Sequence, residues 1–275
     1  MPPLTGAAAG VPAAGVPAAG VPAAGVPAAS PVAAHGRRVF GRLREFYENP
    51  AVPASSGPDR AQRIAGLLSG ALRGVPGPAC ILDVGCGDGA AASLAARRSP
   101  GHRMIGLDWS AGALDRARRH GLTVVRAGVD PPGLPVAAAS ADVVIMSELI
   151  EHLVDTDAAL DEAYRVLKRG GSLLLSTPNL AAWYNRGLMA LGVQPVFSEV
   201  SLRGVYGRPG SQVAGHLRLF TRRALVALLA DRGFAGINVR GARYHDVPGP
   251  LRPVDRLFCA WPAAASILLV HARKK

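Results

Sequence analysis

A regular alternation of strand-like and helix-like runs between residues 80 and 178 constrains the fold more than any other feature. The strand-like runs are short and almost wholly apolar, which is typical of strands covered on both faces. We expect strands at CILDV (80–84), RMIGLD (103–108), LTVVRA (122–127), ADVVIM (141–146) and SLLLSTP (172–178). We expect helices between them at AAASLAARR (90–98), AGALDRARRH (111–120) and DAALDEAYRVLKR (157–169). Ser110 is a natural N-cap for the second of these helices. The alternation predicts an α/β fold with a doubly wound, mostly parallel sheet.

Two more strand-like runs follow a less regular insertion, residues 179–215. AGINVRGARY (235–244) and ASILLVHAR (265–273) bring the sheet to seven strands, and Thr221 caps the helix-like run RRALVALLADRG before them. The insertion is apolar and has few acidic residues. We interpret it as a lid over a substrate, because loops beyond strand ends carry specificity in this architecture, with an interface helix as the alternative.

The N-terminus contains four tandem GVPAA units between Gly10 and Ala29. Proline at every fifth residue prevents a helix, and such a segment cannot bury a core. We therefore expect a disordered tail over residues 1–36 and a folded domain over 37–275.

The chain shows neither the pattern of a signal peptide nor an apolar run long enough to span a membrane, and its three cysteines fit a reducing compartment. These features predict a cytoplasmic protein.

A glycine turn, ILDVGCGDG (81–89), follows the first strand and opens a helix. In this context glycines let the backbone approach a ligand, because no Cβ stands in the way. The spacing of Gly85, Gly87 and Gly89 is G-x-G-x-G, which differs from that of a dinucleotide fold. Asp83, just before the turn, would repel a pyrophosphate and would hold a ligand that carries an ammonium group. The turn therefore indicates a site for a zwitterionic ligand.

Two residues at the end of the second strand extend this site. Asp108 stands 25 residues after Asp83, where an acidic side chain can accept hydrogen bonds from ribose hydroxyls. Trp109 beside it can stack on an adenine.

The stretch SELIEHL (147–153) comes directly after the fourth strand. Glu148, Glu151 and His152 stand at i, i+3 and i+4, so any helix that starts here places them on one face. Two carboxylates and an imidazole suit a divalent cation. The alternative is a metal-free pocket in which the same residues meet an acceptor.

Four stretches, ILDVGCGDG, GLDWS, LPVAAASADVVIMSELIEHL and VLKRGGSLLLSTPN, resemble the successive motifs of class I S-adenosylmethionine-dependent methyltransferases. The resemblance covers residues 80–180 strongly and continues more weakly to the C-terminus. It implies a Rossmann-like methyltransferase fold whose last strand inserts antiparallel beside strand five. It also implies that S-adenosylmethionine is held by Asp83, Gly85, Cys86 and Gly87 at the methionine, Asp108 and Trp109 at the nucleoside, Asp130 at the adenine amine, and Ser147. At Asp130 the sequence departs from the family pattern, because a proline pair follows it.

The spacing E-x-x-E-H resembles two groups within this superfamily. One is the O-methyltransferases of ubiquinone biosynthesis, and the other is the small-RNA 3′-terminal ribose 2′-O-methyltransferases, which hold a metal with these residues and a later histidine. His216, in GHLRLFT, corresponds to that histidine. The resemblance implies a catalytic site of Glu148, Glu151, His152 and His216, which are also candidate ligands for Mg²⁺ or Mn²⁺. Without a metal, His152 or His216 would act as the general base.

These features predict a methyltransferase that acts on oxygen of a small hydroxylated acceptor, whether aromatic, lipid-like or glycosidic. The net charge of +12 is also compatible with RNA, but 28 of the 31 basic residues are arginines spread along the chain, which we interpret as a compositional bias. RNA ribose methylation remains an alternative, as does a non-enzymatic accessory protein of methionine biosynthesis. The sequence does not define an oligomeric state.

Overall fold

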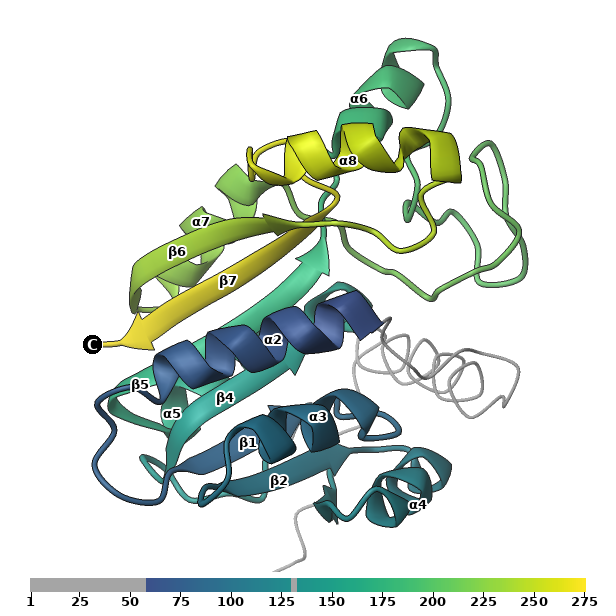
Figure 1. Ribbon diagram of the computed structural model, residues 1–275. Coiled ribbons are helices and arrows are strands. Elements are labelled where there is room, and N and C mark those ends of the chain that lie inside the picture. The colour runs from purple at the N-terminus through teal and green to yellow at the C-terminus, as the bar shows by residue number, and fades with distance from the viewer. Residues whose placement is uncertain (1–57, 130–132) are drawn as a thin grey trace, which may run out of the picture.

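The computed structural model describes residues 58–129 and 133–275, and its centre is one seven-stranded sheet (Figure 1). The strands lie in the order β3-β2-β1-β4-β5-β7-β6. Strands β1 to β5 pair in parallel, whereas β7 is antiparallel to both β5 and β6. The strands are β1 (Cys80–Val84), β2 (Arg103–Asp108), β3 (Thr123–Arg126), β4 (Ala141–Ser147), β5 (Leu167–Pro178), β6 (Phe234–Ala242) and β7 (Ile267–Lys274). The predicted fold class and the antiparallel last strand are confirmed.

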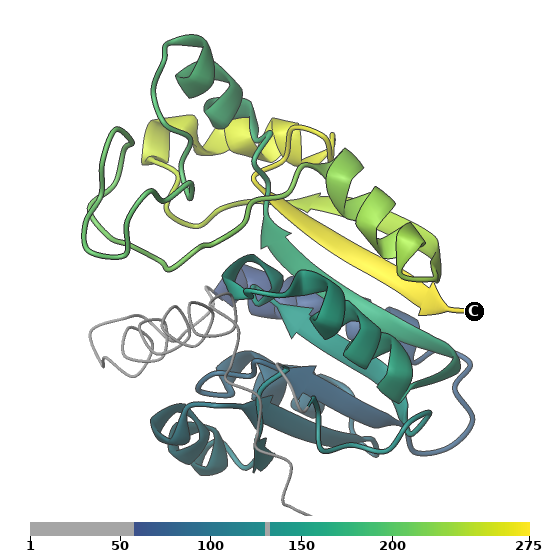
Figure 2. The same ribbon diagram turned by 180° about the vertical axis from the view of Figure 1, so that it is seen from behind.

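Helices cover both faces of the sheet. Figure 1 shows α2 and α3 in front of it, and Figure 2 shows α5 and α7 on the opposite face. Each layer buries its own apolar cluster against the sheet. The helices are α2 (Pro58–Ala71), α3 (Ala90–Arg98), α4 (Ala111–Arg119), α5 (Thr156–Val166), α6 (Trp183–Ala190), α7 (Arg222–Asp231) and α8 (Arg252–Cys259). Ser110 and Thr221 cap α4 and α7 as predicted, each accepting a backbone N–H through its hydroxyl.

One predicted boundary is wrong. The helix expected to reach residue 169 ends at Val166, because Leu167 is already extended and pairs with Ala141 of β4. Strand β5 therefore begins five residues before the expected Ser172, and it passes through an irregular register beside Ala141. The helix α8, between β6 and β7, is not among the predicted elements.

Part of the prediction lies outside the described residues. This holds for the tail over residues 1–36 and for residues 37–57 of the expected folded domain. Within residues 58–129 and 133–275, no helix combines the length and the apolar character needed to cross a membrane.

The connections beyond the carboxyl ends of β5 and β6 form a second layer over that end of the sheet. Figures 1 and 2 show α6 and α8 lying against each other there. The ring of Trp183 stacks on Phe258 with centroids 5.7 Å apart, and its indole N–H donates to Asp255 at 3.1 Å. These contacts join the insertion after β5 to the connection between β6 and β7.

Candidate active site

A cavity of about 1760 Å³ lies at the carboxyl ends of the parallel strands. Its walls come from the turn after β1, the end of β2, the segment after β4 and the two connections that carry α6 and α8. The residues predicted for the cofactor and those predicted for the acceptor line this same cavity: Asp83, Gly85, Cys86, Gly87, Asp108, Trp109, Ser147, Glu148, Glu151, His152 and His216. Asp130 lies outside the described residues.

The glycine turn after β1 has a backbone that other residues adopt only with strain. Gly85 and Gly89 have φ angles of 74° and 76°. A Cβ on Gly85 would lie 2.8 Å from the Leu149 side chain, and one on Gly89 would lie 2.7 Å from the Cβ of Ala117. The glycines therefore permit both the turn and the close packing of its neighbours.

Two buried carboxyl groups flank this turn. Burial, and to a smaller extent the negative charge of the nearby Asp108, raises the pKa of Asp83 to about 7. Burial also raises the pKa of Asp108, whose two carboxylate oxygens accept the N–H groups of Gly87 and Ser110, both at 2.9 Å. Asp108 thus ties the glycine turn to the end of β2. Such a buried acidic pair is suited to a ligand that brings a positive charge to Asp83.

Cys86 and Trp109 border this part of the cavity in different ways. The thiol of Cys86 packs against Gly106, where a Cβ would lie 2.7 Å from its sulfur. Burial, followed by Asp83 and Asp108, raises the pKa of this thiol, so Cys86 is no nucleophile. Trp109 is half-buried beside the cavity, and its carbonyl accepts the Arg126 side-chain N–H at 3.0 Å.

The segment after β4 does not form the expected helix. Glu148 has a left-handed backbone with φ of 53°, and only Ile150–His152 form a single 3-10 turn. The side chain of Glu148 accepts a hydrogen bond from the Ser176 hydroxyl of β5 at 2.8 Å. The three polar side chains are consequently not placed by one helical face.

Tertiary contacts nevertheless bring most of the predicted site together. The imidazole rings of His152 and His216 have centroids 4.7 Å apart, and one ligand-type atom from each of Glu151, His152 and His216 lies within 4.8 Å of the others. Glu148 is not part of this group. Glu151 is fully buried, and its carboxylate accepts from the Thr177 hydroxyl at 3.0 Å. Its backbone carbonyl accepts the N–H of Leu217 at 2.8 Å, which fixes the segment that carries His216.

The hydrogen bonds of the two histidines define their tautomers. The Nδ1 of His152 lies 3.2 Å from the carbonyl oxygen of Gly215, and the Nδ1 of His216 lies 3.2 Å from that of Phe197. Because a carbonyl oxygen only accepts, each Nδ1 must carry the proton, which leaves each Nε2 with a lone pair in the neutral ring. Burial lowers the pKa of His216, so this ring is neutral at pH 7.

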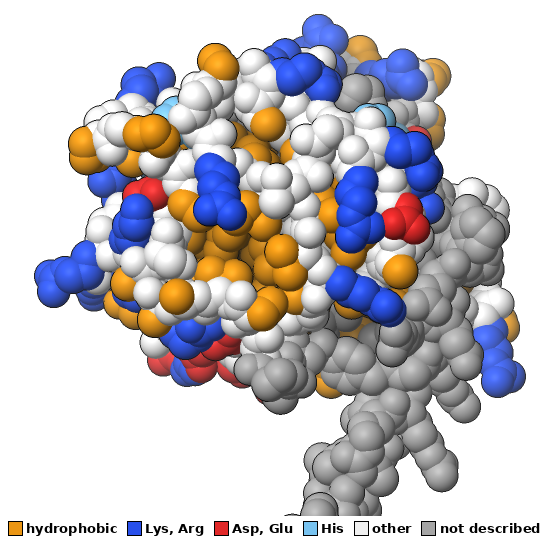
Figure 3. Space-filling model, turned by 90° about the horizontal axis from the view of Figure 1, so that it is seen from below, with side chains coloured by type: hydrophobic (Ala, Val, Ile, Leu, Met, Phe, Trp, Pro, Cys, Tyr) orange, Lys and Arg blue, Asp and Glu red, His pale blue; other side chains and the backbone are white. Residues whose placement is uncertain are grey.

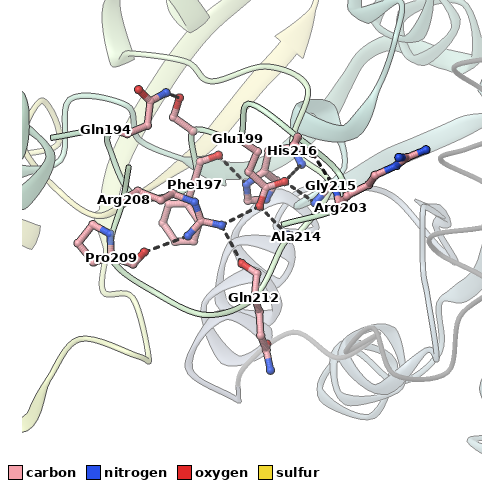
Figure 4. Close-up of polar contacts among 12 residues, drawn as sticks. Gln194, Phe197, Glu199, Arg203, Arg208, Pro209, Gln212, Ala214, Gly215 and His216 are labelled. Atoms are coloured by element: carbon pink, nitrogen blue, oxygen red, sulfur yellow. Dashed lines mark hydrogen bonds and ion pairs between the residues drawn. The ribbon is translucent and has the colours of Figure 1, made fainter. Parts of the chain in front are cut away.

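Glu199 supports His216, although sequence analysis did not single it out. Its carboxylate accepts the backbone N–H groups of Ala214, Gly215 and His216 at 2.6, 2.7 and 3.0 Å (Figure 4). It also pairs with Arg208 at 3.1 Å, and the two side chains are only 2% and 6% exposed. The signal that could have found it is that Glu199 is the only acidic residue in the insertion.

The two connections supply most of the apolar part of the cavity wall, although polar residues such as Arg208, Gln212 and Asp246 also line it there. The insertion contributes Trp183, Tyr184, Leu188, Leu191, Val196 and Phe197, and the connection between β6 and β7 contributes Tyr244, Val247 and Leu251. The second connection was missed by sequence analysis because it has no long periodic run.

Comparisons with known proteins agree with this geometry. Residues 58–239 match a family model described as a methyltransferase domain. The chain is 40% identical over 100 residues to a Mycolicibacterium smegmatis protein named "Probable S-adenosylmethionine-dependent methyltransferase", covering 36% of this chain and 38% of that protein. It is 35% identical over 116 residues to a malonyl-[acyl-carrier protein] O-methyltransferase of Herminiimonas arsenicoxydans, covering 42% and 43%. The matches thus span less than half the length of these two relatives.

A solved structure shares the fold. An S-adenosylmethionine-dependent methyltransferase of Thermotoga maritima superposes with a TM-score of 0.52 and 19% identity, covering 86% of this chain and 99% of that one.

Proposed function

The chain belongs to the methyltransferase domain family, and we propose that it transfers a methyl group from S-adenosylmethionine to an oxygen of a small, largely apolar, hydroxylated acceptor. The observation that carries this proposal is the shared cavity. The acidic glycine turn lies in one part of it, and the two histidines, each with its Nδ1 bonded to a backbone carbonyl, lie in another.

The residues of the turn fit the cofactor. Asp83 would hold its ammonium group, Asp108 its ribose hydroxyls, and the backbone of Gly85, Cys86 and Gly87 would accommodate the methionine part. The bound sulfonium supplies an activated methyl group for in-line displacement. Ser147 and Trp109 would complete the cofactor contacts, because both line the same cavity.

The acceptor hydroxyl must lose its proton as the new bond forms. His216 is suited to this step, because its Nε2 is unprotonated and burial keeps the ring neutral. His152 offers a second Nε2 beside the fully buried Glu151, 3.9 Å from its carboxylate. In this account Glu151 stabilises the positive charge that develops on a histidine, and Glu148 lines the acceptor side.

The same residues also form a candidate site for a divalent cation. The donor set of Glu151, His152 and His216 fits a metal ion, because one possible ligand atom from the carboxylate and from each imidazole lies within 4.8 Å of the others. Mn²⁺ accepts imidazole ligands more readily than Mg²⁺ does. Bound there, the ion would lower the pKa of the acceptor hydroxyl.

The lining of the cavity favours an apolar acceptor over RNA. Aromatic and aliphatic side chains of the insertion surround the histidines, so we propose that the insertion acts as a lid. Figure 3 shows basic side chains scattered among hydrophobic ones on the face seen from below, without a continuous basic band. The name of the Herminiimonas relative supports oxygen as the target atom.

Labelled methyl transfer tests the proposal. The protein is incubated with methyl-labelled S-adenosylmethionine and, separately, with hydroxylated lipids, catechols, glycosides and short RNAs. Label should enter an organic-soluble product as a methyl ether or ester. Label in RNA would support the ribose alternative.

Transfer that survives EDTA would exclude the metal, whereas EDTA-sensitive transfer restored by Mn²⁺ would favour it.

A further inference from the structure

Exposed apolar side chains gather on α6, on α8 and at their ends. We call these residues the α6–α8 surface: Met189 (50% exposed), Leu191 (79%), Leu251 (42%), Val254 (37%), Leu257 (72%) and Trp261 (59%). Large apolar side chains grouped on an exposed surface mark an interaction site more often than chance exposure.

The two helices of this surface are joined by side-chain contacts. The stacked rings of Trp183 and Phe258 join α6 to α8 on the buried side, and Asp255 accepts from both Trp183 and Ser266 there. Val254 and Leu257 stand at i and i+3 on one exposed face of α8, and the exposed Trp261 follows two residues beyond the end of the helix.

Exposed basic groups stand on the same two helices. Arg252 and Arg256 are exposed and stand one helical turn apart on α8, and Arg186 is exposed on α6. Two of the three acidic residues in segments 179–215 and 243–263, Glu199 and Asp255, are internally paired and almost wholly inaccessible. The charged side chains exposed on α6 and α8 are therefore all arginines, and they accompany exposed apolar side chains, which is the composition of a helix lying in the headgroup region of a membrane.

The cavity opens within this surface. Leu191 and Leu251 belong to the α6–α8 surface, and both also line the cavity. An apolar molecule that leaves a bilayer at this point would reach the histidines along apolar side chains.

We propose that the α6–α8 surface docks on an anionic lipid membrane, with Leu257 and Trp261 entering the headgroup region and the arginines contacting lipid phosphates. The entry of the acceptor from that membrane rests on the proposed function, whereas docking does not. A second copy of the chain fits less well, because a symmetric contact would bring the arginines of the two copies together.

Sedimentation of the full chain with lipid vesicles tests docking. Vesicles of phosphatidylcholine with one-third phosphatidylglycerol should bind the protein, and vesicles of phosphatidylcholine alone should bind it at least tenfold more weakly. The double variant Leu257→Glu/Trp261→Glu should lose binding tenfold or more. Arg252→Glu/Arg256→Glu should remove the preference for anionic lipid.

The matched control is Val125→Glu. Val125 is 39% exposed on β3, at the opposite edge of the sheet from β6, against which α8 packs. It should bind vesicles as the wild type does. The proposal would be overturned if Val125→Glu lost as much vesicle binding as Leu257→Glu/Trp261→Glu, or if the wild type did not bind anionic vesicles. So would a dimer that Leu257→Glu/Trp261→Glu dissociates, if vesicle binding is absent.

Calorimetric S-adenosylmethionine binding separates this result from the proposed function. All these variants should bind the cofactor like the wild type, because none of the residues lies among those proposed to hold it. Docking would then be judged by the vesicles alone, even if no methyl acceptor were found.

Discussion

His152 and His216 face each other with ring centroids 4.7 Å apart, although 64 residues separate them in the chain. The contact depends on Glu151, whose carbonyl binds the N–H of Leu217, and on Glu199, which binds the N–H of His216 itself. The backbone carbonyl of Glu151 and the carboxylate of Glu199 thus set the geometry of the proposed acceptor site.

Glu199→Gln should impair the reaction through His216. Burial lowers the pKa of His216, while the negative charge of Glu199 raises it. Removing that charge should lower this pKa further and move the acid limb of the kcat profile to lower pH, and the loosened loop should lower kcat about tenfold. Asp142→Asn is the control, because Asp142 also accepts a backbone N–H and pairs with a lysine, but at the other end of the sheet. An unchanged acid limb in Glu199→Gln would show a purely structural role.

Cofactor binding should release a proton through Asp83. The pKa of about 7 leaves this group partly protonated in the free protein, and the cofactor's ammonium group would ionise it. Affinity should therefore rise with pH between about 6 and 8. Calorimetry in buffers of different ionisation enthalpy measures the proton, and Asp83→Asn should abolish its release and weaken binding by about 1.4 kcal/mol or more. Equal affinity at pH 6 and pH 8 would contradict this role.

Asp83→Asn should also stabilise the ligand-free fold at high pH. The folded-state pKa is raised above the unfolded value, so the stabilisation is present at low pH and is lost as pH rises through about 7. The side-chain amide of the variant carries no charge, so the fold avoids the cost of burying a carboxylate. The melting temperature of Asp83→Asn should exceed that of the wild type at pH 8, and the difference should shrink at pH 5.

Asp108→Ala should weaken both the cofactor site and the fold. Lost hydrogen bonds to the ribose would cost about 1.5–3 kcal/mol of binding. The variant also leaves the N–H groups of Gly87 and Ser110 without their acceptor, so its melting temperature should fall. Calorimetry and thermal melts measure the two effects separately. A stable variant with unchanged cofactor affinity would exclude Asp108 from the site.

The sequence predicted the sheet well because its signals are local. Apolar runs, glycine turns and the caps Ser110 and Thr221 identified the strands and helices within a few residues. The order of the last strands followed from the family resemblance and not from the residues themselves.

The site was predicted less completely, because its geometry arises from tertiary contacts. The spacing of Glu148, Glu151 and His152 suggested a helix, but Glu148 adopts a left-handed backbone and leaves the group. The role of Glu199 depends on a segment 15 residues further along the chain, which no local pattern reveals. Helix α8 is eight residues long and begins beside a proline, so its periodic signal is weak.

Single-turnover methyl transfer by His152→Asn and His216→Asn tests the central claim most directly. Each variant is first saturated with labelled S-adenosylmethionine and then mixed with the acceptor, so that binding and chemistry are measured apart. The account predicts cofactor affinity within about twofold of the wild type and transfer slowed by about 10²–10⁴-fold in at least one variant, because general-base catalysis contributes about that much. In the wild type, transfer should fall only at a pH below the usual pKa of a histidine, because burial lowers the pKa of His216. Transfer at the wild-type rate in both variants would contradict the claim that these histidines form the acceptor site.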